Sequence, residues 1–157
     1  MPLVVRPALA EDRELAYLVK RAALGAYVAQ VWGWDDAFQR AFHASDWAAH
    51  RPDIVELDGQ PIGTIEVIEH PDHLYLGELC LLPAMQRRGL GTQLLAHVLA
   101  RVLARVLARA DALRLPVRLQ FLTVNPVRSL YERHDFTVVG ETGSHRLAER
   151  PARATVA

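Results

Sequence analysis

The chain has little of several features that mark particular classes of protein. Its 157 residues include a single cysteine, which excludes an intrachain disulfide and favours a reducing compartment. Lys and Arg together number 18, as do Asp and Glu, so no excess of charge points to nucleic acid or to an anionic membrane. No apolar run is long enough to span a bilayer, and the first residues lack the apolar stretch of a signal peptide. We therefore expect a cytoplasmic protein that binds neither nucleic acid nor membrane.

The composition and the hydrophobic pattern are those of an ordinary globular domain. Hydrophobic residues make up 51% of the chain and charged residues 23%. Alternation and turn residues predict strands at 3–7, 53–57, 61–69, 73–82, 116–124, 136–140 and 144–149. Helical periodicity and capping residues predict helices at 11–28, 35–50, 92–110 and after Asn125. This order predicts a single α/β (α+β) domain with a mixed sheet over residues 1–150, followed by a frayed tail at 151–157.

The most informative stretch, from Gln86 to Gly91, reads Gln-Arg-Arg-Gly-Leu-Gly. It follows an apolar strand and precedes a helix that we expect to begin at Thr92. A helix N-terminus attracts phosphate, glycine lets the backbone approach it, and Arg87 and Arg88 add positive charge. The stretch lacks the Gly-Lys-Ser/Thr of a P-loop and the third glycine of a dinucleotide fingerprint. It therefore predicts a pyrophosphate cradle of another kind.

A second motif, at residues 125–136, reads Asn-Pro-Val-Arg-Ser-Leu-Tyr-Glu-Arg-His-Asp-Phe. Asn125 is a suitable N-cap, and Pro126 suits the first position of a helix. Helical spacing places Arg128 and Glu132 on one face, where an i, i+4 ion pair can form. The motif therefore predicts a short helix that is capped by Asn125.

Together the two motifs resemble those of the GCN5-related N-acetyltransferase (GNAT) family, and the resemblance covers roughly Val4 to Leu147. It implies a mixed, mostly antiparallel sheet with a splayed central strand pair and flanking helices. It also implies transfer of an acetyl group from acetyl-CoA to a primary amine of a small molecule or peptide. Asp135 stands where the family usually has a glycine, at a site that favours positive φ, and Asp tolerates this backbone better than most residues.

The resemblance also implies roles for two titratable side chains. Tyr131 would protonate the thiolate of coenzyme A as it leaves, and Glu78, on the strand before the loop, would take a proton from the amine. Alternation along that strand places Glu78 among apolar residues, and burial there would raise the pKa of its carboxyl group. Glu66, His145 and a chain of water molecules are the alternative proton acceptors.

The contacts implied for acetyl-CoA lie on the strand, the loop and the second motif. The backbones of Leu81 and Leu82 would take the pantetheine arm as a splayed strand takes an added one. The full set of implied contacts is Leu81, Leu82, Gln86, Arg87, Arg88, Gly89, Leu90, Gly91, Thr92 and Asn125. No metal is expected, because the His70-Pro-Asp-His73 segment is better explained as a turn than as a metal site.

Two segments have a structural and a functional interpretation. Trp32 and Trp34, followed by two aspartates, lie where the resemblance places the acceptor pocket, and aromatic walls with carboxylates suit a cationic amine. Packing at the corner between two helices is the alternative. A face with His97, Arg101 and Arg105 is either a basic ridge for an acidic partner or a solvated helix face, and the second is favoured.

Three functions are therefore compared. The first is an acetyl-CoA-dependent N-acetyltransferase, the second is a non-catalytic acyl-CoA-binding or sensor module of the same fold, and the third is a partner-binding domain. Tyr131 favours the enzyme, because a module that only binds has no need of this hydroxyl group. An exposed edge strand near the C-terminus is compatible with a homodimer.

Overall fold

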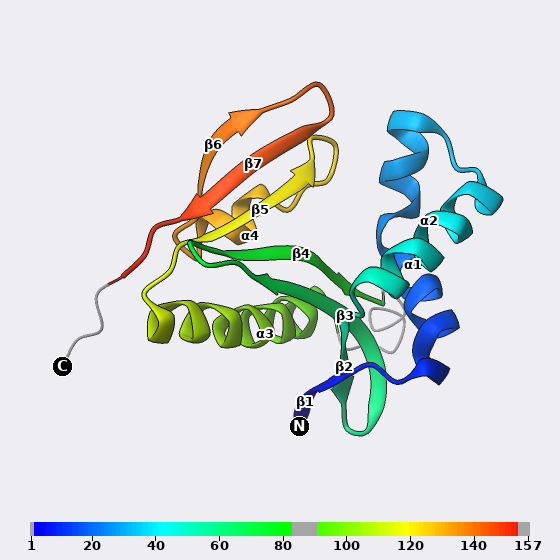
Figure 1. Ribbon diagram of the computed structural model, residues 1–157, viewed down its shortest axis with the longest axis horizontal. Helices are drawn as coiled ribbons and strands as arrows, with labels where there is room; N and C mark the ends of the chain where they lie inside the picture. The colour runs from blue at the N-terminus through cyan, green and yellow to red at the C-terminus, as the bar shows by residue number, and fades with distance from the viewer. Residues whose placement is uncertain (1, 83–90, 154–157) are drawn as a thin grey trace. The chain divides into compact units, whose positions relative to one another are not determined.

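The computed structural model describes residues 2–82 and 91–153 (Figure 1). The strands are β1 (Leu3–Pro7), β2 (Asp53–Leu57), β3 (Gln60–Glu69), β4 (Leu74–Leu81), β5 (Val117–Leu122), β6 (Thr137–Glu141) and β7 (His145–Arg150). The helices are the 3-10 turn η1 (Ala10–Asp12) and α1 (Arg13–Trp32), α2 (Asp36–Ala49), α3 (Gly91–Leu113) and α4 (Arg128–Glu132). No helix in these two described ranges is long and apolar enough to cross a membrane.

The strands form a mixed sheet in the order β1-β2-β3-β4-β5-β7-β6. Strands β1 and β2, β2 and β3, β5 and β7, and β6 and β7 pair antiparallel. Strands β4 and β5 pair in parallel, with Leu74–Leu76 opposite Val117–Leu119. The predicted α+β fold, with a mixed and mostly antiparallel sheet and flanking helices, is confirmed.

The chain divides into two compact units. The first comprises residues 1–66 and 78–102, and the second comprises residues 67–77 and 103–157. Strands β3 and β4 and helix α3 contribute residues to both. Glu78 thus belongs to the first unit and Tyr131 to the second.

In the first unit, local sequence signals set the β2–β3 hairpin, the end of α1 and the start of α2. Asp58 and Gly59 adopt φ values of 51° and 77°, as a tight hairpin between β2 and β3 requires. Gly33, with φ 78°, ends α1 four residues beyond the predicted end, and its N–H donates to the carbonyl of Ala29. Asp35 caps α2 as predicted, because its carboxylate accepts a hydrogen bond of 3.1 Å from the N–H of Phe38.

The core of the first unit holds these helices against the sheet. Ala16 of α1, Trp47 of α2 and Ile54 of β2 belong to one buried cluster, together with Ala8. Burying apolar side chains contributes about 25 cal/mol for each Å² removed from water, so such clusters position the polar residues that flank them. Ala16 and Trp47 also line the pocket described below.

The second unit places Tyr131 in an aromatic cluster. The Tyr131 ring lies 5.9 Å from the Phe121 ring and 5.5 Å from the Phe136 ring, measured between centroids.

Two predicted backbone features of the second unit are present. Asp135 has φ 70°, which confirms the positive φ expected where the family usually has glycine. The predicted turn after β3 is also present, because the N–H of His70 donates to the carbonyl of His73.

The start of α4 differs from the prediction. The helix begins at Arg128 with Val127 as its N-cap residue, so Asn125 does not cap it. The reason is a tight turn before the helix, in which the carbonyl of Asn125 accepts a hydrogen bond from the N–H of Val127. Because Asn125 and Pro126 form this turn, the helix starts after them. The predicted ion pair between Arg128 and Glu132 is confirmed at 2.8 Å.

Side-chain contacts hold the chain in place at Arg150 and Arg153, near its C-terminal end. Arg150, the last residue of β7, is buried and its guanidinium bonds to Asp111 of α3 at 3.0 Å and 3.2 Å. Arg153 forms an ion pair with Asp135, so the predicted fraying does not begin directly after Arg150. Strand β6 lies at an edge of the sheet, and a homodimer through that edge stays a prediction.

A close contact in the first unit makes Gly63 a test of the β3–β4 packing. A Cβ at this position would lie 2.3 Å from the carbonyl oxygen of Cys80, which is backbone and cannot rotate away. We expect Gly63→Ala to lower the free energy of unfolding by about 1–3 kcal/mol, the usual effect of overpacking. Urea denaturation measures this change. Gly143→Ala is the control, since nothing lies within 4 Å of its added Cβ, and an equal loss in both variants would contradict the prediction.

Candidate active site

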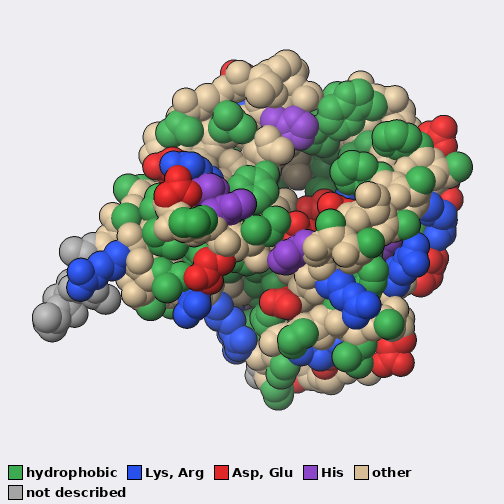
Figure 2. Space-filling model, in the orientation of Figure 1, with side chains coloured by type: hydrophobic (Ala, Val, Ile, Leu, Met, Phe, Trp, Pro, Cys, Tyr) green, Lys and Arg blue, Asp and Glu red, His purple; other side chains and the backbone are tan. Residues whose placement is uncertain are grey.

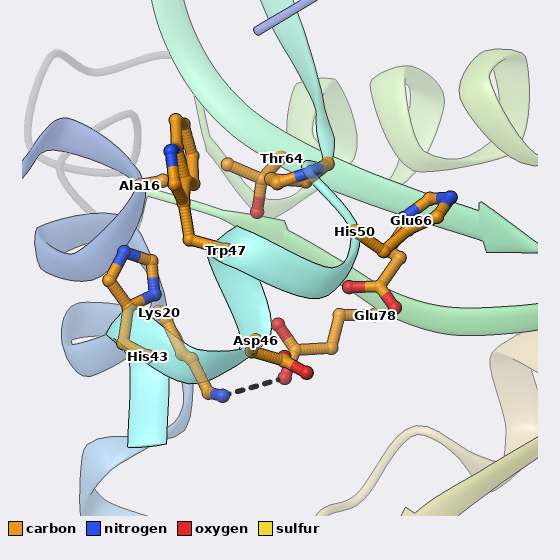
Figure 3. A pocket seen from close by; sticks show the side chains of 10 residues that line it. Ala16, Lys20, His43, Asp46, Trp47, His50, Thr64, Glu66 and Glu78 are labelled. Atoms are coloured by element: carbon orange, nitrogen blue, oxygen red, sulfur yellow. Dashed lines mark ion pairs between the residues drawn. The ribbon is translucent and has the colours of Figure 1, made fainter. Parts of the chain in front are cut away.

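A polar pocket lies in the first unit, between the two N-terminal helices and the middle of strands β3 and β4 (Figure 3). Helices α1 and α2 carry one wall, and β3 and β4 carry the other. Its lining residues are Ala16, Lys20, His43, Asp46, Trp47, His50, Pro52, Thr64, Glu66 and Glu78. Ten lining residues thus include three carboxylates and a single ammonium group, which gives the pocket an acidic character.

The ammonium of Lys20 is paired with Glu78. Lys20 Nζ lies 2.9 Å from Glu78 Oε1, and the exposed fractions of the two side chains are 15% and 29%. Burial by itself lowers the pKa of Lys20, but attraction to Glu78 outweighs it, so the pKa is raised and the amine stays charged. Figure 3 shows this ion pair crossing the pocket from α1 to β4.

Glu66 is the carboxyl group with a pKa near neutrality. Burial raises its pKa first, the negative charges of Asp46 and Glu78 raise it further, and the result is about 7. Lys20 acts in the opposite direction and lowers it. A carboxyl group with this pKa gains and loses a proton in the range where general acid–base catalysis is efficient.

The surroundings of Glu78 differ from the prediction. Leu74, Leu76 and Cys80 on the same strand are buried, as alternation indicates. Glu78, however, does not lie in an apolar neighbourhood, because the α1 helix brings Lys20 against it. A charge on another element, which periodicity along β4 cannot reveal, therefore decides the environment. Its role as proton acceptor stays a prediction.

Asp35 and Asp36 are engaged in structure rather than in this pocket. Asp35 caps α2, and Asp36 accepts hydrogen bonds from the hydroxyl of Tyr17 and from Arg40. Trp34 packs 6.5 Å from the Tyr17 ring, which supports the interpretation as a helix corner. Hydrophobic side chains are visible at the surface over α1 and α2 (Figure 2), and Trp32 is 60% exposed.

The end of β4 refines the predicted contacts of the pantetheine arm. The N–H of Leu82 donates to the carbonyl of Ile62 at 2.7 Å, so this N–H is not available to the pantetheine arm. Backbone groups of successive strand residues point to opposite edges, so those of Leu81 point away from β3. Leu81 therefore keeps the geometry that strand addition requires, and Leu82 does not.

The remaining predicted contacts fall on or beside the loop. Residues Gln86, Arg87, Arg88, Gly89 and Leu90 lie outside the described residues. Helix α3 begins at Gly91, one residue before the predicted start at Thr92, so a helix N-terminus does follow the loop. Asn125 lies in the turn before α4, in the second unit, and its contact with acetyl-CoA stays a prediction.

A known domain family accounts for this combination of sheet, loop position and pocket. The profile of the acetyltransferase (GNAT) domain matches residues 49–138, which is more than half of the chain. The chain belongs to the GNAT family. The match covers β2 to α4 and thus includes Glu66, Glu78 and Tyr131.

Solved GNAT-type structures share the fold over nearly the whole chain. The PaiA N-acetyltransferase of Thermoplasma acidophilum, solved with coenzyme A, is 20% identical with a TM-score of 0.67 over 96% of this chain and 99% of that one. An acetyltransferase of Thermus thermophilus is 20% identical with a TM-score of 0.68, over 96% and 97%. The ribosomal-protein-S18-alanine N-acetyltransferase of Escherichia coli is 16% identical with a TM-score of 0.59, over 99% and 97%. Identities this low show the fold alone, and no curated protein sequence matches the chain.

Several residues that line the pocket of this GNAT protein were not predicted from the sequence. Lys20, Asp46 and the imidazoles of His43 and His50 were not among the predicted site residues, although they line it. The spacing of His43 and Asp46 by three residues places them on one face of α2, and His50 directly follows the helix as its C-cap residue. The spacing was a signal present in the sequence. Lys20 carries no such signal, because only the tertiary fold brings it to Glu78.

Proposed function

We propose that the chain is an acetyl-CoA-dependent N-acetyltransferase that acts on a primary amine of a small molecule or peptide. Membership of the GNAT family supports an acetyltransferase, and the single cysteine is in keeping with a cytoplasmic location. The observation that carries the proposal is the pocket carboxyl group of Glu66, whose pKa of about 7 suits proton transfer at neutral pH.

The proton accepted from the amine goes to Glu66. An amine attacks only when it is neutral, and an ammonium group that enters a pocket with three carboxylates first needs an acceptor for its proton. Glu78 is already paired with Lys20, whereas Glu66 is held near the midpoint of its titration at pH 7. We therefore assign the role of base to Glu66, one of the three alternatives to Glu78. Glu78 instead pairs with Lys20 and keeps that ammonium in the pocket.

The remaining steps fall to Tyr131 and the end of β4. Acetyl-CoA supplies the thioester, whose C–S bond breaks as the C–N bond to the amine forms. The Tyr131 hydroxyl gives its proton to the departing thiolate, and the proton that the nitrogen sheds after attack restores the hydroxyl. The first proton of the ammonium stays on Glu66 until solvent takes it up. The backbone of Leu81 would bind the pantetheine arm, and the loop from Gln86 to Leu90 would hold the pyrophosphate with the N-terminus of α3.

The proposal predicts that the purified protein releases coenzyme A thiol from acetyl-CoA only when a suitable amine is present. A thiol-specific dye, applied across a panel of primary amines and N-terminal peptides, measures the release, and mass spectrometry identifies the acetylated product. Reactions without amine are the control. Binding of acetyl-CoA in calorimetric titration, without thiol release for any amine, would instead support the acyl-CoA-binding module.

A further inference from the structure

Lys20 is the only lysine in a sequence whose Lys and Arg residues number 18. It lies on α1, and two contacts from other elements hold its ammonium in the pocket. Glu78 Oε1 of β4 lies 2.9 Å away, and the ring centroid of Phe42 on α2 lies 5.1 Å away. Both interactions favour a cation at this point. The side chain is only 15% exposed, so it is part of the pocket and not of the solvated surface.

The ammonium of Lys20 lies among carboxyl and imidazole side chains. The pocket is lined by His43 and Asp46 of α2, by His50 just after that helix, by Glu78 of β4, and by Thr64 and Glu66 of β3. His43 Nε2 donates to the carbonyl of Arg13, 3.1 Å away, which ties the imidazole ring to α1. Lys20 is therefore the one permanent cation among the ten described residues that line the pocket, against three carboxyl groups.

We propose that Lys20 is a positioning residue of this site, whose ammonium holds the Glu78 carboxylate in place and offsets the like charges beside Glu66. Glu66 then exchanges a proton near neutral pH instead of remaining protonated. The catalytic consequence rests on the proposed function, but the charge arrangement does not.

The test is a titration of Glu66 in the free protein, without acetyl-CoA or amine. Carboxyl carbons are labelled with ¹³C in glutamate, and the Glu66 signal is identified by its absence in Glu66→Gln. In Lys20→Met, which keeps the length of the stem and removes the charge, the titration midpoint of Glu66 should move upward by about one pH unit. In Glu78→Gln, which removes a like charge and leaves Lys20 unpaired, the midpoint should move downward.

The opposite shifts of the Glu66 midpoint in Lys20→Met and Glu78→Gln distinguish this electrostatic role of Lys20 from a purely structural one. Lys20→Arg keeps the charge and should leave the midpoint close to that of the wild type. If Lys20→Met does not fold by circular dichroism, Glu78→Gln and Lys20→Arg still test the inference. An unchanged midpoint in Lys20→Met or in Glu78→Gln, or a shift in the same direction in both, would overturn it.

The kinetic readout separates this inference from the proposed function. With an acceptor amine found by the thiol-release screen, the acid limb of the pH–rate profile should move upward in Lys20→Met and return in Lys20→Arg. Loss of rate at all pH values without displacement of the limb would mean that Lys20 only supports the fold. An absence of acetyl transfer by the wild type would refute the proposed function and leave the titration result standing.

Discussion

Tyr131→Phe should lower turnover by roughly 10²–10⁴-fold and leave acetyl-CoA affinity almost unchanged. The substitution removes only the hydroxyl, and the ring keeps its contacts with Phe121 and Phe136. The loss follows because a thiolate that departs without a proton donor is a poorer leaving group, while the hydroxyl acts mainly in the transition state. Steady-state kinetics and calorimetric titration with acetyl-CoA measure the two quantities.

Tyr27→Phe is the matched control for this substitution. Tyr27 is a half-buried tyrosine of α1 and has no proposed part in the chemistry, so its variant should keep the wild-type turnover. Full activity of Tyr131→Phe would make Tyr131 a core residue and leave water as the proton donor. Normal turnover with poor acetyl-CoA affinity would make the hydroxyl a ligand contact instead.

Glu66→Gln should reduce turnover by a comparable factor, roughly 10²–10⁴-fold, because the amide cannot accept the proton of the amine. In the wild type, the base works when unprotonated, so kcat/KM should fall as the pH is lowered through about 7, the pKa of Glu66. The glutamine variant should lose this acid limb as well as the rate. A pH–rate profile of both proteins measures the two effects together.

Glu69→Gln provides the control on the same strand. Glu69 lies at the end of β3, is exposed, and forms a surface ion pair with Arg109 at 3.3 Å, an interaction that contributes little to stability. We expect this variant to keep both the rate and the acid limb. If Glu78→Gln, and not Glu66→Gln, abolished turnover and the limb, the proton acceptor would be the residue predicted from the sequence.

Much of the fold follows from signals that are local in the sequence. The hairpin at Asp58 and Gly59 and the cap at Asp35 were predicted at the right residues, because turn and cap chemistry depends on a few neighbours. Strand β1 was predicted with both of its ends. The cap at Asn125 failed for a physical reason: a side chain suited to capping was used in a turn that delays the helix.

The candidate site could be predicted only in part. Alternation along β4 indicates correctly which neighbours of Glu78 are buried, but it cannot show that Lys20, 58 residues earlier, neutralises it. For the same reason the sequence leaves Glu66 among several alternatives, since its pKa depends on charges from α1, α2 and β4. Tertiary contacts set the protonation of the pocket, whereas the sequence sets which groups are present.

The buried cysteine of β4 gives the chain a built-in reporter of local opening. Cys80 is 1% exposed, and burial, ahead of the charge of Glu78, raises the pKa of its thiol, so the reactive thiolate is scarce in the folded protein. It is the only thiol in the sequence, so an alkylating reagent has a single target and needs no engineered label. The rate of alkylation therefore reports how often a local opening exposes Cys80 on the strand that carries Glu78, and its change on adding acetyl-CoA would measure how strongly the ligand suppresses that opening.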